Sequence, residues 1–268
     1  MSERVGDPVW EKIRTEVASD AEREPLLASF LYSVVLNHKT LEDALSFHLA
    51  SKLESATIPA ISLRDLIDTA FAHDPAIGEA IRADIQAVVD RDPAAGGYST
   101  PLLYFKGFHS IQSYRVANYY WKHDRRPLAY YLQSRIASVF AVDIHPAARI
   151  GKGILMDHAT GVVIGETAVV EDNGSMLHEV TLGGTGKEHG DRHPKIRKGV
   201  TIGAGAKILG NVEIGEGALI GGGSVVLDPV PPHCTAVGVP AKVTHYHAGH
   251  EPAREMNHSD AGYSDYSI

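Results

Sequence analysis

Two short polar segments of this chain hold the side chains best suited to proton transfer and to anion binding. His158 follows Asp157 in the first segment, and Arg192 precedes His193 in the second. An imidazole has an ordinary pKa of about 6.5 and can accept a proton at neutral pH, as a general base must. A guanidinium offers a planar pair of N–H groups that matches a carboxylate. The two segments therefore predict a general base and a carboxylate-binding cation.

A histidine base works with a partner that fixes its tautomer, and two aspartates could supply one. Asp157 is next to His158 in the chain. Asp143 precedes Ile144, whose strand we expect to stack beneath the strand of Ile164, and the His158 turn leads into that same face. The spacing alone leaves both aspartates as candidates.

Both polar segments interrupt a repeat of period six that begins near Val142. Small or aliphatic residues usually lie two positions before each repeated aliphatic residue, and glycine often follows it. The repeated residues are Ile144, Ile150 and Met156; Ile164, Val170, Met176 and Leu182; and Ile196, Ile202, Ile208, Ile214, Ile220 and Val226. A short fixed period of this kind is typical of a parallel β-helix, in which three hexads close one triangular coil. We predict a left-handed parallel β-helix over residues 142–242.

The repeat breaks twice, and the polar segments occupy the breaks. Met156 and Ile164 are eight positions apart, so two extra residues lie between them. Leu182 and Ile196 are fourteen positions apart, which we interpret as one hexad and an eight-residue loop that leaves the coil, in preference to two hexads and two extra residues. Solenoids accept insertions where binding occurs, and departures from local regularity tend to fall at functional sites. The breaks favour a catalytic coil over a purely structural scaffold.

The first half of the chain has helical periodicity. Apolar residues recur every three or four positions over 26–35, 41–49 and 77–88, and further helices are expected near 107–122 and 127–139. The expected helix starts are Thr40 with Asp43, Ser62 with Asp65, and Asp74 before Pro75. These signals predict an all-α domain over residues 1–141 that packs and oligomerises.

Composition and charge exclude several classes of protein. The formal net charge is −8, which argues against a nucleic-acid binder. A single cysteine, Cys234, excludes a disulfide framework and a multi-cysteine zinc site. No apolar run approaches the ~18 residues that span a membrane, and the N-terminus lacks a signal pattern, so we expect a cytoplasmic protein with no membrane partner. Residues 243–268 lack both periodicities and are expected to form a flexible tail.

Several segments carry a pattern more specific than the hexad. They are residues 91–103, 143–148, 157–161, 180–187, 190–196 and 203–211. These segments resemble the serine O-acetyltransferases, a family of hexapeptide-repeat acyltransferases, and the resemblance extends over nearly the whole chain up to about Lys242. It implies transfer of acetyl from acetyl-CoA to the hydroxyl of L-serine, which gives O-acetyl-L-serine and CoA in the first step of cysteine biosynthesis.

The resemblance also implies roles for individual residues. His158 would be the general base and Asp143 its orienting partner. The ammonium of serine would lie against Asp92 and Asp157, and its carboxylate against Arg192 and His193. The pantetheine of acetyl-CoA would follow the coils near Gly184, Ala204 and Gly223, with Lys242 as a candidate for a CoA phosphate, and no metal is required.

The resemblance further implies partners. The family is typically a dimer of trimers, with active sites between neighbouring β-helices and helical domains that join the trimers. L-Cysteine is expected as a feedback inhibitor at the serine site. The terminal Ile268 would dock into the active-site cleft of O-acetylserine sulfhydrylase.

Two other enzyme classes remain as alternatives. One is a hexapeptide acyltransferase with a different acceptor. The other is a γ-type carbonic anhydrase, also a trimeric left-handed β-helix, which binds zinc through three histidines; here the candidates are His145, His158 and His178. A scaffold without catalytic function is a third possibility.

Overall fold

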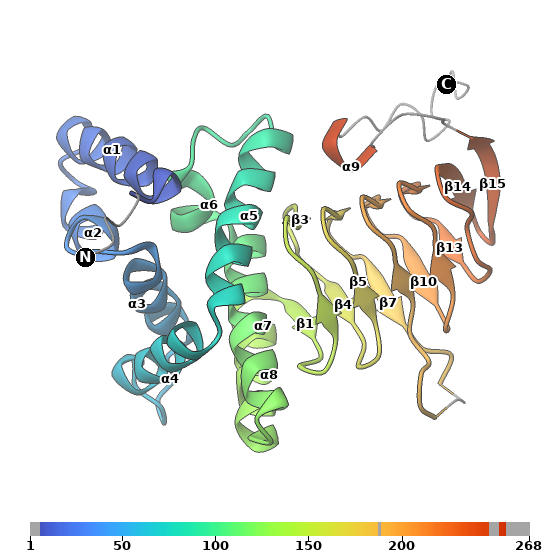
Figure 1. The fold of residues 1–268 in the computed structure, drawn as a ribbon, viewed down its shortest axis with the longest axis horizontal. Coiled ribbons are helices and arrows are strands. Elements are labelled where there is room, and N and C mark those ends of the chain that lie inside the picture. The colour runs from blue at the N-terminus through green and yellow to red at the C-terminus, as the bar shows by residue number, and fades with distance from the viewer. Residues whose placement is uncertain (1–5, 187–188, 247–251, 256–268) are drawn as a thin grey trace.

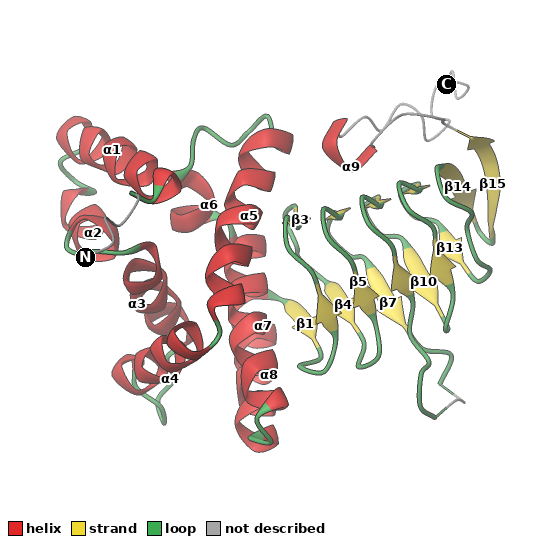
Figure 2. Cartoon of the chain, in the orientation of Figure 1, coloured by secondary structure: helices red, strands yellow, loops and turns green. Residues whose placement is uncertain are grey.

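A computed structural model describes residues 6–186, 189–246 and 252–255, and it contains a helical part followed by a stack of coils (Figure 1). Figure 2 shows that the helices before residue 141 occupy one end of the molecule and the strands the other, with the short C-terminal helix beside the strands. The helices are α1 (Pro8–Arg23), α2 (Ala28–Leu31), the π-helical turn η1 (Tyr32–Leu36), α3 (Leu41–Leu53), α4 (Ala60–His73), α5 (Pro75–Arg91), α6 (Ser99–Tyr104), α7 (Lys106–Lys122), α8 (Arg126–Phe140) and α9 (Pro252–Glu255). Among the described helices, none is both long and apolar enough to cross a membrane.

Two of the predicted helix starts are confirmed by their caps. The Thr40 hydroxyl accepts the backbone N–H of Asp43 at 3.1 Å, at the start of α3. The Asp74 carboxylate accepts the N–H of Ala76 at 3.2 Å, with proline at the first position of α5. Each side chain satisfies a backbone donor that the helix itself leaves without a partner.

The predicted start at Ser62 with Asp65 is wrong. Helix α4 begins at Ala60 after Pro59, and Ser62 donates its backbone N–H to the Pro59 carbonyl within the first turn. Helix α1 was not among the predicted helices, although Asp7 before Pro8 is the same start signal as Asp74 before Pro75. The helical period is hard to recognise in α1, because its buried apolar residues are few: Trp10, Ile13 and Val17.

The strands form three sheets, one on each face of a triangular coil, as the hexads predict. The coil strands within each sheet run parallel. The strands of sheet A are β1 (Val142–Ile144), β4 (Val162–Ile164), β7 (Thr181–Gly183), β10 (Lys207–Leu209) and β13 (Val225–Val226). Sheet B contains β2 (Arg149–Ile150), β5 (Val169–Val170), β8 (Lys195–Ile196) and β11 (Glu213–Ile214). Sheet C contains β3 (Leu155–Met156), β6 (Ser175–Met176), β9 (Thr201–Ile202), β12 (Leu219–Ile220), β14 (Cys234–Gly238) and β15 (Ala241–Tyr246).

The interpretation of both breaks in the repeat is confirmed. Ile144 pairs with Ile164 on neighbouring coils of sheet A, so the two extra residues after Met156 lie in a turn. Leu182 is in sheet A and Ile196 is in sheet B, the next face, so one hexad step and an inserted loop separate them. The repeated aliphatic residues point inward and are almost all buried, which gives the coil a continuous apolar core.

The C-terminal boundary differs from the expected one. Strand β15 pairs antiparallel with β14 and continues to Tyr246, beyond the predicted end of the coil at residue 242. Four residues of the predicted flexible tail form α9, and Ala253 in it is buried. The remainder of that tail, including Ile268, lies outside the described residues.

A buried polar junction joins the helical part to the first coil. Arg115 on α7 pairs with Asp84 on α5 at 2.7 Å, with both side chains buried, and it also donates to the Gly151 carbonyl at 2.8 Å. The Tyr114 hydroxyl donates to the Ala148 carbonyl, and burial raises the pKa of this phenol. A buried charged group is costly unless its polar atoms have hydrogen-bond partners. These contacts therefore fix how the helical part packs on the first coil.

Candidate active site

The turns beside sheet A form two corners of the coil, and these corners hold the predicted site residues other than Asp92, Asp143 and Lys242. All strands of sheet A are parallel, so the turns before them lie at one edge and the turns after them at the other. The His158 corner consists of residues 157–161, 177–180, 203–206 and 221–224. The Arg192 corner consists of residues 145–148, 165–168, 184–186 and 189–194. Strands of two or three residues at about 3.3 Å each separate the corners by roughly 10 Å.

The two extra residues of the first break turn the His158 side chain out of the coil. His158 and Ala159 have positive φ angles of 56° and 62°, a region that residues other than glycine rarely adopt. The N–H of Gly161 donates to the Ala141 carbonyl at 2.7 Å and holds the bulge against the coil. The His158 side chain is 73% exposed, as a base that must meet a substrate requires.

Asp157 is a polar neighbour of His158 in the described structure. His158 Nε2 and Asp157 Oδ2 are 3.6 Å apart, which is longer than a hydrogen bond. The ring of His178 on the next coil lies edge-on to His158, with 5.9 Å between the ring centroids. Within the described residues, the buried Nδ1 of His178 has no hydrogen-bond partner.

A cavity of about 330 Å³ adjoins His158 and is lined by Asp92 and Asp157. Asp92 caps the C-terminus of α5, and its Oδ1 accepts the N–H of Ala94 at 2.8 Å. A Cβ on Gly107 would lie 2.0 Å from the Met156 carbonyl oxygen, so only glycine lets α7 begin this close to the coil. The cavity therefore offers two carboxylates beside a histidine, and Lys106, which also lines it, donates to the Thr160 hydroxyl. The two carboxylates suit a substrate ammonium.

At the other corner, Arg192 is held by an acidic partner. Its Nη2 donates to Glu166 Oε2 at 2.7 Å, and its Nη1 donates to the Gly190 carbonyl at 3.0 Å. The hydrogen bond from Arg192 lowers the pKa of Glu166. The pair fixes the direction of the guanidinium.

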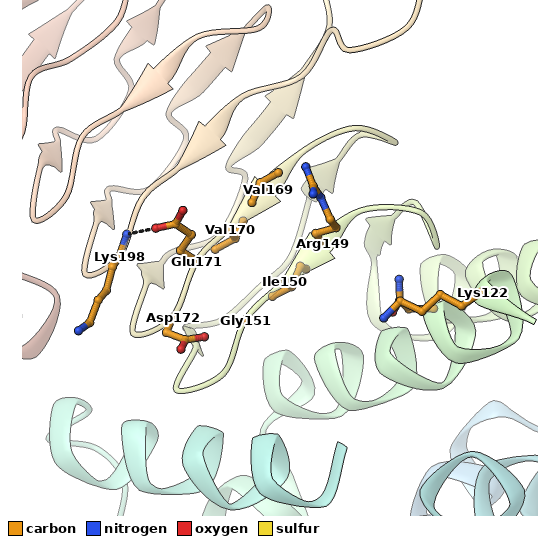
Figure 3. Close-up of a pocket in the computed structure, with 10 residues that line it drawn as sticks. Lys122, Arg149, Ile150, Gly151, Val169, Val170, Glu171, Asp172 and Lys198 are labelled. Carbon is orange, nitrogen blue, oxygen red and sulfur yellow. Dashed lines mark hydrogen bonds between the residues drawn. The ribbon is translucent and has the colours of Figure 1, made fainter. Parts of the chain in front are cut away.

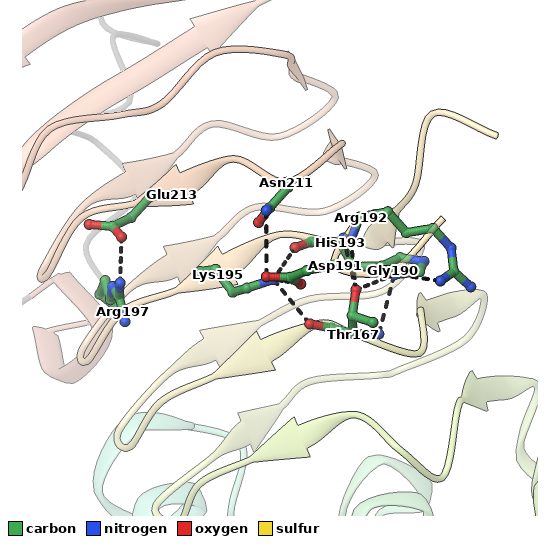
Figure 4. A network of polar contacts seen from close by, with 9 residues as sticks. All are labelled: Thr167, Gly190, Asp191, Arg192, His193, Lys195, Arg197, Asn211 and Glu213. Atoms are coloured by element: carbon green, nitrogen blue, oxygen red, sulfur yellow. Dashed lines mark hydrogen bonds and ion pairs between the residues drawn. The ribbon is translucent and has the colours of Figure 1, made fainter. Parts of the chain in front are cut away.

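His193 is held in one tautomer by Thr167 (Figure 4). The Thr167 N–H donates to His193 Nδ1 at 3.2 Å, and the Thr167 hydroxyl lies 2.9 Å from the same nitrogen. Nδ1 is therefore the acceptor, and Nε2 carries the proton. Burial and then the charge of Arg192 lower the pKa of His193, which keeps the ring neutral with an N–H to donate. A Cβ on Gly165 would lie 2.1 Å from this ring.

The base of the inserted loop is tied to the coil by Lys195 (Figure 4). Its ammonium donates to the carbonyls of Thr167 and His193 at 3.1 and 2.6 Å and to Asp191 at 2.6 Å. The hydrogen bond from Lys195 lowers the pKa of Asp191. The C-terminal end of the loop is thus tied to the coil. Residues 187 and 188 of the loop lie outside the described residues.

Asp143, the other candidate partner of His158, lies on the outer face of sheet A. Its Oδ1 accepts Nε2 of Gln133 on α8 at 2.7 Å. At the Arg192 corner, burial lowers the pKa of His145, and the negative charges of Glu166 and Asp143 partly oppose that shift. No described contact within the chain joins Asp143 to His158, so Asp157 is the closer neighbour here and the role of Asp143 stays a prediction.

The predicted acetyl-CoA residues divide between the two corners. Ala204 and Gly223 lie on consecutive coils at the His158 corner, where the Gly223 N–H donates to the Ala204 carbonyl at 2.7 Å. Gly184 lies at the Arg192 corner, with a Cβ position 3.5 Å from His193 Nε2. Lys242 is on β15 with an exposed side chain. Within one chain the structure does not bring these four residues together.

A larger cavity, of about 520 Å³, lies on sheet B and the turns that follow its first two strands (Figure 3). It opens on sheet B near the end of α7 and is lined by Lys122, Arg149 and Lys198. Its two carboxylates are already engaged, because Glu171 pairs with Arg197 at 2.8 Å and Asp172 accepts the N–H of Lys152 at 2.8 Å. No histidine lines it, so we place the chemistry in the smaller cavity at His158.

Comparison with known proteins identifies the family. The N-terminal serine acetyltransferase model matches residues 9–113, and the bacterial transferase hexapeptide model matches residues 193–228. The chain is 56% identical over 257 residues to serine acetyltransferase of Haemophilus influenzae, covering 96% of both chains. The chain belongs to the serine acetyltransferase family. The crystal structure of serine acetyltransferase from Vibrio cholerae superposes with a TM-score of 0.93 at 57% identity, covering 95% of this chain and 98% of that one.

Solved serine acetyltransferases of the same fold contain ligands. The Brucella abortus structure in complex with coenzyme A is 52% identical with a TM-score of 0.89, covering 91% of this chain and 97% of that one. The soybean structure complexed with serine is 61% identical with a TM-score of 0.86, covering 88% of this chain and 97% of that one.

This membership decides between the alternatives for the enzyme class. The chain is an acyltransferase of the serine acetyltransferase family, and the carbonic anhydrase alternative is not supported. The three candidate zinc ligands also divide, because His158 and His178 lie at one corner and His145 packs on Trp121 at the other. In the described part of the chain, no three potential ligand side chains form a metal-binding group.

Sequence reasoning missed two residues of this serine acetyltransferase site, Thr167 and Glu166. Thr167 accepts the backbone N–H groups of Arg192 and His193 at 3.0 and 3.1 Å, and Glu166 pairs with Arg192. Their signal in the sequence is weak, since a polar pair in a hexad turn is ordinarily solvated. The coil register could have found them, because it places the turn after β4 below the loop that follows β7.

Proposed function

We propose that this chain transfers acetyl from acetyl-CoA to the hydroxyl of L-serine, with His158 as the general base. The observation that carries the proposal is the His158 bulge, which presents an imidazole beside two carboxylates and a cavity in a chain of the serine acetyltransferase family. The soybean relative was solved with serine and the Brucella abortus relative with coenzyme A, which supports both substrates.

In the proposed reaction His158 moves one proton. It accepts the proton of the serine hydroxyl as that oxygen attacks the thioester carbonyl of acetyl-CoA. The new carbon–oxygen bond forms, the carbon–sulfur bond breaks, and His158 returns the proton to the CoA sulfur. A thiol is a far stronger acid than an alcohol, so the leaving group needs little further assistance. Holding both substrates in place supplies much of the remaining acceleration.

Serine would be recognised by both of its charged groups. Asp92 and Asp157 line the cavity beside His158 and are proposed to bind the ammonium. Arg192 and the Nε2–H of neutral His193 are proposed to bind the carboxylate. A neutral histidine that donates from a fixed nitrogen favours a hydrogen-bond acceptor, such as a carboxylate oxygen, over a donor.

We propose that the complete site forms between two copies of the chain. The corners that hold the two sets of residues are roughly 10 Å apart, which is too far for one free serine to span. A trimer about a threefold axis would place the His158 corner of one coil against the Arg192 corner of its neighbour. The same arrangement would bring Ala204 and Gly223 of one chain near Gly184 of the next, where pantetheine could lie between them. It would also offer Asp143 of a neighbour as a partner for His158.

We also propose two regulatory partners. L-Cysteine shares the ammonium and carboxylate of serine, and a related serine acetyltransferase was solved in complex with cysteine, so it should compete with serine. A concentration of cysteine for half-inhibition that does not rise with the serine concentration would contradict this. The terminal Ile268 is proposed to bind O-acetylserine sulfhydrylase, and calorimetry with the tail peptide, with and without Ile268, would show binding only with it.

The acceptor test measures thiol release from acetyl-CoA in separate assays with L-serine, L-threonine, L-homoserine and a sugar. The proposal predicts rapid release with serine and far slower release with the others. Faster release with threonine, homoserine or the sugar than with serine would overturn it.

A further inference from the structure

Helix α5 carries Asp92 to the His158 cavity, and its last residue is anchored to the coil. The Arg91 side chain is 7% exposed. Its Nη1 lies 3.3 Å from the Gly174 carbonyl, 3.4 Å from the Asn173 carbonyl and 3.2 Å from the Ser175 hydroxyl. A buried guanidinium needs such acceptors, and all three belong to one turn and strand of the second coil.

The same helix has a second anchor about two turns earlier. Asp84 Oδ1 accepts the N–H of Ile154 at 2.9 Å, and Asp84 Oδ2 accepts Arg115 at 2.7 Å. Ile154 precedes β3, which leads directly into Asp157 and His158. Asp84 therefore fixes the middle of α5 to the coil, whereas Arg91 fixes the end from which Asp92 extends.

The position of the Asp92 carboxylate follows from that helix end. The Asp92 N–H donates to the Val88 carbonyl at 2.9 Å within the last turn of α5. Its Oδ1 accepts the N–H of Ala94, so this oxygen is held to the backbone that follows α5. The separation between Asp92 and Asp157 across the cavity is thus set by how the end of α5 lies on β6, through Arg91.

We propose that Arg91 is a positioning residue for the substrate ammonium: it touches no substrate, and it holds Asp92 at the distance from Asp157 at which both carboxylates reach one ammonium. This inference rests on the proposed role of Asp92 in binding serine. Charge-assisted hydrogen bonds are sensitive to small displacements, so loosening this helix end weakens serine binding and leaves the acetyl-CoA side of the reaction unchanged.

The test compares steady-state constants of the full-length Arg91→Met and Arg91→Lys variants. Arg91→Met removes the donors, and we expect the KM for serine to rise about tenfold, with kcat and the KM for acetyl-CoA within about twofold of the wild type. Arg91→Lys keeps a cation that can reach one carbonyl and should recover part of the loss. A merely structural role would lower the melting temperature without this selective change in the KM for serine.

Arg82→Met is the matched control on the same helix. Arg82 is nine residues before Arg91 and pairs with Asp7 and Glu42 at 2.6 Å, within the helical part of the protein. We expect its loss to lower the melting temperature and to leave the KM for serine unchanged. An equal rise in this KM for Arg82→Met and Arg91→Met would overturn the inference, because the effect would then be general.

Asp92→Asn separates this inference from the proposed function. A raised KM for serine in Asp92→Asn, with a wild-type KM in a folded Arg91→Met, would overturn the role of Arg91 and leave that of Asp92 intact. A wild-type KM in Asp92→Asn would instead overturn the assignment of Asp92 to the ammonium. Should Arg91→Met fail to fold, Ser175→Ala removes one Arg91 acceptor, together with the hydrogen bond from the same hydroxyl to the Ala253 carbonyl. An unchanged serine KM both there and in Arg91→Lys would contradict the proposal.

Discussion

Thr167 fixes the tautomer of His193, because its backbone N–H donates to Nδ1 at 3.2 Å while its hydroxyl lies 2.9 Å from the same atom. The hydroxyl oxygen also accepts the backbone N–H groups of Arg192 and His193. One threonine on the coil therefore orients both residues proposed to bind the carboxylate of serine, although it stands outside the inserted loop.

Replacing this threonine should weaken serine binding selectively. Thr167→Val keeps the shape and removes the hydroxyl, and we expect a rise of roughly five- to tenfold in the KM for serine, equivalent to about 1 kcal/mol of lost hydrogen bonding. The KM for acetyl-CoA should change little. Substrate titrations of Thr167→Val and of Thr167→Ser, which retains the hydroxyl, test this expectation; a wild-type KM for serine in Thr167→Val, or an equal rise in both variants, would contradict this role of the hydroxyl.

Removing the proposed base should act on turnover. His158→Ala is expected to lower kcat by roughly 10²–10⁴, or about 3–5.5 kcal/mol of barrier. The fold should be retained, because this side chain lies mainly in solvent. Asp143→Asn should cost less than loss of the base itself. Rate measurements at saturating substrates check both variants, and wild-type turnover in a folded His158→Ala would contradict the mechanism.

The helical part should lose stability in acid because of two buried histidines. Burial, followed by the charge of Lys52, lowers the pKa of His48 to about 4, and burial followed by His48 lowers that of His109 to about 3. Below the unfolded value of 6.5, the unfolded chain binds protons that the folded chain excludes. Stability is therefore fully present above that value and falls by roughly 2 kcal/mol for each histidine between pH 6.5 and pH 4.5.

Chemical denaturation at both pH values tests the effect of acid. His109→Gln keeps an N–H that can donate to the Leu102 carbonyl, the bond that His109 Nε2 makes at 2.8 Å. This variant should have a smaller loss of unfolding free energy on acidification than the wild type. An equal loss would show that His109 does not contribute to the pH dependence.

The sequence predicts the coil well because the hexad is a strictly local signal. Period, breaks and the pairing of Ile144 with Ile164 all follow from counting residues. The helix start at Ser62 was misplaced because a capping pattern carries little information without knowledge of the packing. Arg91 could not be found because its acceptors near Gly174 are more than eighty positions away.

The sequence predicts which residues belong to the candidate site, but only part of how they are arranged in space. The polar breaks identify His158 and Arg192 because irregularity in a regular coil is visible in sequence. Their separation on two corners depends on which face each strand joins, so it follows from the whole topology. The partner of His158 was undecided for the same reason, because Asp143 lies on strand β1 and His158 lies in the turn before β4.

The most direct test of a site shared between chains is activity complementation between two variants, His158→Ala and Arg192→Ala. Each variant alone should be nearly inactive, because each loses one corner of every site. If a site takes its two corners from neighbouring chains, random mixed assemblies should regain about a quarter of the wild-type sites. Thiol release by the co-expressed variants, with mixed assembly verified by mass spectrometry, should recover to that level. Mixed assemblies that remain as inactive as the separate variants would contradict a site shared between chains.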